Sequence, residues 1–82
     1  MTKAELMAIE AKYDFEIARD PITREAWGLV KECEANDEIE KIIEDVNAEG
    51  NPYVGGEATY LGNYATYRIY CPKTWFDLWG WK

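Results

Sequence analysis

The sequence predicts a small α+β domain, in which a short antiparallel sheet carries an acidic amphipathic helix on one face. Three observations lead to this class. Apolar residues over 37–48 recur at helical spacing, residues 57–71 alternate as two strands around a Gly-Asn pair, and no linker or repeat divides the chain. With 48% hydrophobic residues, the chain is expected to fold as one domain over residues 1–82.

The first predicted element is a helix over residues 3–12. Thr2 and Glu5 have the spacing of a capping box, in which each side chain bonds a free backbone amide of the other residue. Leu6 and Ile9 then begin an apolar helical face.

A β-hairpin is predicted over residues 13–33. Aromatic and aliphatic side chains alternate with acids over 13–17, as in a half-buried strand, and Asp20 and Pro21 favour a turn. The alternative is a helix that Asp20 caps and Pro21 begins, because apolar residues after Pro21 also keep helical spacing. We favour the hairpin because Gly28 and its aromatic and β-branched neighbours are poor helix formers.

The helix over 37–48 has the clearest pattern in the chain. Its apolar residues fall at i, i+3, i+4 and i+7, and these are Ile39, Ile42, Ile43 and Val46. Gly50 follows its end, as is common after helices.

The hairpin over 57–71 can be checked for internal consistency. With Gly62 and Asn63 as a two-residue turn, Leu61 faces Tyr64, Thr59 faces Thr66 and Glu57 faces Arg68. The opposite face is apolar and suited to pack against a helix; its residues are Ala58, Tyr60, Ala65, Tyr67 and Ile69. Residues 74–82 form a final aromatic segment, with one helical turn expected from Thr74.

The net charge of the protein is concentrated in one stretch. Residues 32–49 hold eight acids and one base, Lys41, which gives −7, while the rest of the chain is neutral. The acids are Glu32, Glu34, Asp37, Glu38, Glu40, Glu44, Asp45 and Glu49. If the whole stretch were helical it would span about 27 Å. The stretch would then carry one net negative charge per about 4 Å, compared with one per about 3.4 Å along a DNA strand.

This density suggests two interpretations. The acids can form an ordinary solvated helix face, or they can imitate phosphates and occupy a groove that another protein keeps for nucleic acid. For the second, the expected binding residues are Glu34, Asp37, Glu38, Glu40, Glu44, Asp45 and Glu49. Direct binding of nucleic acid is not expected, because there is no basic stripe to neutralise phosphates.

The aromatic residues give an alternative binding surface. Tyr53, Trp75, Trp79 and Trp81 could anchor a protein partner or a second copy of the chain, since Trp and Tyr often dominate interfaces. With Tyr60 and Tyr64 they could also stack on a nucleotide or other small ligand. The competing interpretation is that the tryptophans complete the core of a small domain.

The composition argues against catalysis. The chain has no His, Ser or Gln, which excludes Ser–His and Cys–His nucleophile systems and His-containing zinc sites. Cys33 and Cys71 form no CxxC pair, and the paired acids do not match a calcium-binding loop. No catalytic residues, metal or cofactor are therefore expected.

Cellular context follows from the same features. The N-terminus becomes acidic before any apolar run and no stretch of about 20 apolar residues exists, so neither a signal peptide nor membrane insertion is expected. A cytoplasmic protein with reduced thiols is the expectation. In size and charge the chain resembles the small acidic anti-CRISPR and antirestriction proteins of phages and mobile elements. The resemblance implies an inhibitor that blocks a nucleic-acid-binding protein.

Overall fold

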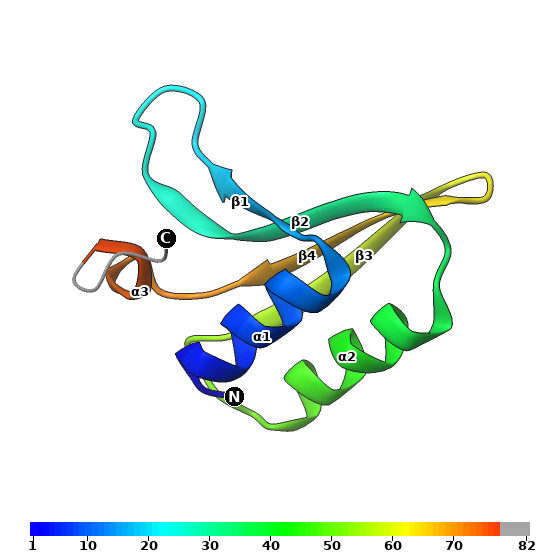
Figure 1. Ribbon diagram of the computed structural model, residues 1–82, viewed down its shortest axis with the longest axis horizontal. Helices are drawn as coiled ribbons and strands as arrows, with labels where there is room; N and C mark the ends of the chain where they lie inside the picture. Colours follow the sequence, from blue (N-terminus) through cyan, green and yellow to red (C-terminus); the bar gives the residue numbers. More distant parts are fainter. Residues whose placement is uncertain (78–82) are drawn as a thin grey trace.

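Two helices cover one face of a four-stranded antiparallel sheet (Figure 1). The computed structural model describes residues 1–77. In chain order the elements are α1 (Lys3–Tyr13), β1 (Glu16–Arg19), β2 (Ala26–Glu34), α2 (Asp37–Ala48), β3 (Gly55–Leu61), β4 (Tyr64–Tyr70) and α3 (Thr74–Asp77). The predicted α+β class is confirmed.

The first six elements are two consecutive helix–hairpin units. The sheet order is β1-β2-β4-β3, and the two central strands, one from each unit, pair antiparallel. In topology the units are therefore related by an approximate two-fold axis through the β2–β4 pair. In this order, β1 and β3 are the two edge strands of the sheet.

The predicted helix over 3–12 is confirmed, but the following strand begins later than expected. The Thr2 hydroxyl accepts a hydrogen bond from the Glu5 amide, at 3.2 Å, and caps α1. The helix continues through Tyr13 and ends where Asp14 adopts a left-handed conformation with φ of 58°. The alternation over 13–17 thus combined the end of a helix with the start of a strand at Glu16.

The hairpin predicted over 13–33 is confirmed against its helical alternative. The Asp20 carboxylate accepts hydrogen bonds from the amides of Ile22 and Thr23, at 2.8 and 3.0 Å, and this fixes the turn between β1 and β2. The pairing shifts near the turn, because Ala18 lies opposite Gly28 while Arg19 lies opposite Ala26. This shift is a β-bulge in β2.

The helix over 37–48 and the hairpin over 57–71 are confirmed, including all three predicted cross-strand pairs. The Asn36 side chain caps α2 by accepting hydrogen bonds from the amides of Glu38 and Ile39. Of the predicted apolar face, Tyr60 remains 57% exposed because it lies on the edge strand beside the turn. The core joins both helices to the sheet; its most buried members are Leu6, Leu29, Ile39, Val46, Tyr67 and Ile69.

After β4, the chain forms the expected helical turn from Thr74. Phe76 is buried, and Trp75 is half-buried and packs against the core. Trp79 and Trp81 lie outside the described residues. Within residues 1–77, no helix has the length and apolar character needed to cross a membrane.

Candidate functional site

The acidic stretch does not form one continuous helix. Asp37, Glu38, Glu40, Glu44 and Asp45 lie on α2 and Glu49 follows its end, but Glu34 belongs to β2. Glu34 pairs with Tyr64, and strand alternation directs both side chains to the sheet face opposite the helices. The 12 residues of α2 span about 18 Å, so the acids are not spread along a single 27 Å helix.

A buried tyrosine anchors the start of α2 to the sheet. The Tyr67 hydroxyl accepts a hydrogen bond from the Asn36 amide, at 2.8 Å, and donates one to the Glu40 carboxylate, at 2.9 Å. Burial raises the pKa of Tyr67, and the Glu40 contact adds to this rise. Tyr67 is fully buried, so the contact fixes which side of α2 faces β4.

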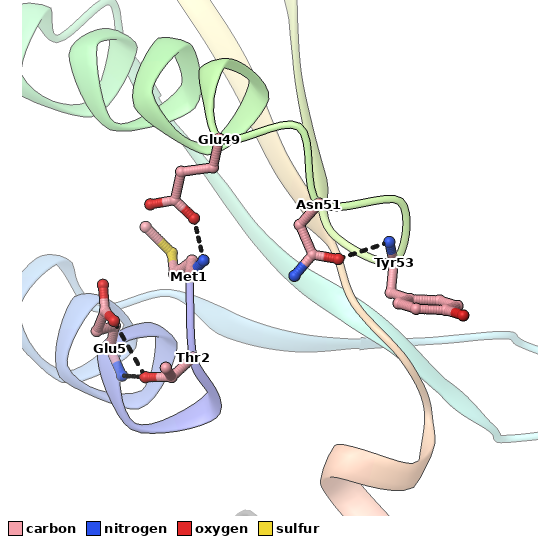
Figure 2. A network of polar contacts seen from close by, with 6 residues as sticks. All are labelled: Met1, Thr2, Glu5, Glu49, Asn51 and Tyr53. Carbon is pink, nitrogen blue, oxygen red and sulfur yellow. Dashed lines mark hydrogen bonds and ion pairs between the residues drawn. The ribbon is translucent and has the colours of Figure 1, made fainter.

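The α1-side flank of α2 consists of Glu38, Asp45 and Glu49, which share one face at i, i+7 and i+11. The Tyr13 hydroxyl at the end of α1 donates a hydrogen bond to Glu38, at 3.1 Å. The amino group of Met1 forms an ion pair with Glu49 (Figure 2). These contacts join opposite ends of the two helices, which are therefore antiparallel.

Cations partly neutralise this flank. Lys41 lies 3.6 Å from Asp45, and the Met1 amino group contacts Glu49. Two of the three carboxylates in the α1-side flank thus have a positive partner.

The β3-side flank of α2 consists of Asp37, Glu40 and Glu44, at i, i+3 and i+7. Asn47 continues the same face and bonds to Gly56 of β3. Within residues 1–77, no cation forms an ion pair with any of the three carboxylates. They follow one another at about 4.5 and 6 Å along the helix axis. The β3-side flank is therefore the more strongly negative side of α2.

The β3-side flank also affects the edge strand beside it. The pKa of Tyr60 is raised, first by desolvation and then by the negative charge of Glu40. Gly56 allows this close approach, because a Cβ at that position would lie 3.0 Å from the Ile43 side chain. The sequence alone does not distinguish the two flanks, because the difference depends on which strand lies beside α2.

Of the predicted aromatic surface, the structure describes Tyr53 and Trp75, while Trp79 and Trp81 lie outside residues 1–77. Tyr53 is 72% exposed in the loop before β3, where its amide bonds to Asn51 and its ring points away from that contact (Figure 2). Trp75 packs against the core. Tyr60 and Tyr64 alternate to opposite faces of the sheet, although both border one hollow at the β3–β4 turn.

An aromatic pair that the sequence analysis did not predict lies on the open face of the sheet. Trp27 stacks on Tyr70 with ring centroids 5.2 Å apart. The bulge in β2 is responsible, because simple alternation along the strand would place Trp27 beside Leu29 on the helix face. Near this pair, Arg68 bonds to Glu57 and Thr59.

The two cysteines are free thiols at opposite ends of the β2–β4 pair. Cys33 lies opposite Ala65, whereas the Cys71 amide bonds to the Trp27 carbonyl. Burial raises the pKa of the Cys71 thiol to about 11. Among residues 1–77, no three acidic or thiol side chains gather closely enough to hold a metal ion.

Comparisons with known proteins give no match. A scan against protein-family models found none, and searches of the curated proteins and of the solved structures found none.

Proposed function

We propose that this protein is a non-catalytic inhibitor that binds another protein at a site which that partner uses for nucleic acid. The α2 surface, and above all its β3-side flank, would take the place of the nucleic-acid backbone. A counter-defence protein of a phage or mobile element, acting in the cytoplasm, is the setting that fits a small acidic inhibitor of this type.

The observation that carries the proposal is the uncompensated row of Asp37, Glu40 and Glu44. Three carboxylates follow one helix flank at about 4.5 and 6 Å, compared with one charge per about 3.4 Å along a nucleic-acid strand. Bases at i+4 from acids on a solvated helix stabilise it by side-chain ion pairs. Here α2 holds a single base, Lys41, and it pairs with Asp45 on the other flank.

Binding rather than catalysis is also supported by the nucleophiles available. The chain lacks imidazole, and the buried Cys71 thiol is protonated near neutral pH because its pKa is about 11. Thiolate, not thiol, is the reactive form of cysteine.

The proposal is tested by capture and competition. The tagged protein is incubated with bacterial lysate at low salt, and captured proteins are identified by mass spectrometry. We expect a nucleic-acid-binding protein that is released by high salt and displaced by its own DNA or RNA, because the exposed Asp37 and Glu44 carboxylates are open to screening. A captured protein that nucleic acid cannot displace, or that high salt does not release, would contradict the mimicry.

A further inference from the structure

Strand β3 leaves part of its backbone unpaired at the edge of the sheet. In an antiparallel pair, every second residue directs its N–H and C=O groups away from the partner strand. The two-residue turn makes Leu61 and Tyr64 a hydrogen-bonded pair, so Thr59 and Glu57 also bond to β4. The outward groups of β3 therefore belong to Gly56, Ala58 and Tyr60.

The side chain of Asn47 already occupies one of these positions. Its amide nitrogen donates to the Gly56 carbonyl, at 3.0 Å, and its oxygen accepts from the Gly56 amide, at 2.8 Å. A neighbouring strand would make the same two bonds. Asn47 thus closes the edge at Gly56, while the outward groups of Ala58 and Tyr60 have no hydrogen-bond partner within residues 1–77.

The other edge of the sheet is less suited to binding a strand. β1 has only four residues, its pairing is interrupted by the bulge, and the Arg19 side chain folds back to the Arg24 carbonyl. Short, charged and irregular edges are typical protection against added strands. β3 has seven residues and no Lys, Arg or Pro.

The surroundings of β3 define what an added strand must contain. Residues opposite Ala58 and Tyr60 would point to the helix side, next to the β3-side flank of α2 and its carboxylates. A residue opposite Thr59 would point to the open face, near Leu61, which is 87% exposed. The edge therefore favours an extended segment in which basic and apolar residues alternate.

A second copy of this chain does not meet that requirement. Pairing two β3 edges would bring two β3-side flanks together, each with three acids and no paired cation within the described residues. Like charges placed opposite each other at an interface oppose association.

We propose that the β3 edge, from Ala58 to Tyr60, binds an extended basic segment of the partner protein by strand addition. The inference rests on the proposed function for the origin of the segment, since proteins that hold nucleic acid are rich in Lys and Arg. Main-chain hydrogen bonds would hold the segment, and Glu40 and Glu44 would select its basic residues.

The test uses a short, end-blocked peptide of alternating valine and lysine, with the full protein at low salt. We expect amide hydrogen exchange at Ala58 and Tyr60 to slow by about tenfold or more when the peptide is bound. Ala58→Pro removes one outward N–H at a position where an edge strand tolerates proline, and should abolish the protection at Tyr60. Ala58→Val, which keeps the N–H, is the matched control.

Two further arms separate this inference from the proposed function. The same peptide with every backbone amide N-methylated has no N–H group to donate to a strand on either edge, so it should lose binding even if Ala58→Pro proves unstable. Neutralising Glu40 and Glu44 should weaken binding of the unmodified peptide. If both the N-methylated peptide and Ala58→Pro leave binding unchanged while the neutralised variant loses it, strand addition is wrong and the acidic surface stands. Absence of binding, or binding without protection of Ala58 and Tyr60, also overturns the inference.

Discussion

At the scale of single residues, Gly28 shows how the absence of a side chain lets two strands approach closely. It lies in the bulge of β2, where an added Cβ would come within 2.0 Å of the Ile69 carbonyl oxygen. Because that oxygen belongs to the backbone of a central strand, no side-chain rearrangement can relieve the contact.

Gly28→Ala should therefore destabilise the protein by about 3 kcal/mol, near the upper end of typical overpacking costs. Gly55→Ala is the control, because the nearest atom to its Cβ would be the Asn47 side-chain oxygen at 3.9 Å. Its effect should stay within about 0.5 kcal/mol. Urea unfolding measures both, and equal losses would contradict the close approach at Gly28.

Cys71 should resist modification in the folded protein. Its thiol is buried, and burial raises its pKa from 9.0 to about 11, so little thiolate forms near neutral pH. Iodoacetamide should label Cys33, which is half-buried, well before Cys71. Mass spectrometry of the Cys33→Ala and Cys71→Ala variants would resolve the two rates, and faster labelling of Cys71 would refute the assignment.

The same shift predicts a pH dependence of stability. The folded state binds the Cys71 proton more tightly than the unfolded chain does. The protonated thiol therefore contributes to the free energy of unfolding in full below pH 9.0, and this contribution is lost as the pH rises through about 11. Cys71→Ala should lose less stability than the wild type over that interval, as urea unfolding at each pH would measure. An equal loss would show that Cys71 does not contribute.

At the scale of elements, α2 is positioned by polar contacts as well as by its apolar face. Tyr67 bonds both to the backbone before the helix and to Glu40 in its first turn. Tyr67→Phe should therefore cost about 2 kcal/mol, because it removes both hydrogen bonds and leaves the Asn36 amide without its acceptor. Tyr64→Phe, at an exposed position, should change the unfolding free energy little in the same urea experiment. Equal effects would mean that the Tyr67 contacts do not hold α2.

Most elements could be predicted from local patterns because their causes are local. The spacing of four apolar residues defined α2, and the two-residue turn defined the register of β3 and β4. The start of β1 was missed because Asp14 ends α1 in a left-handed conformation that periodicity does not reveal. Trp27 was missed because a bulge changes which face of the sheet it occupies.

The candidate site was predictable only in part. The sequence located the acids, but the division of α2 into two flanks depends on its neighbours, α1 on one side and β3 on the other. The separation of Glu34 from the helix likewise follows from the length of β2. The open edge of β3 requires the strand order, which no local pattern contains.

At the scale of the whole molecule, the approximate two-fold arrangement places α1 beside one flank of α2 and β3 beside the other. These two flanks differ in how far cations neutralise them. The α1-side flank has Lys41 and the Met1 amino group as partners, whereas the β3-side flank has no ion pair within residues 1–77. The β3-side flank is therefore the side of α2 with more negative charge that no cation pairs among the residues that the structure describes. Association with a basic partner should be fast and should weaken steeply with salt.

The most direct test compares two triple variants of equal charge, with binding measured against the captured partner. One neutralises the β3-side flank (Asp37→Asn, Glu40→Gln, Glu44→Gln) and the other neutralises the α1-side flank (Glu38→Gln, Asp45→Asn, Glu49→Gln). Each removes three negative charges, so both have a net charge of −4 instead of −7. Far-UV circular dichroism and thermal unfolding first establish that both variants keep the fold. We expect the β3-side variant to raise Kd by about tenfold or more, and the α1-side variant to change Kd by less than about threefold. Equal losses, or a larger loss in the α1-side variant, would contradict the assignment of binding to the β3-side flank.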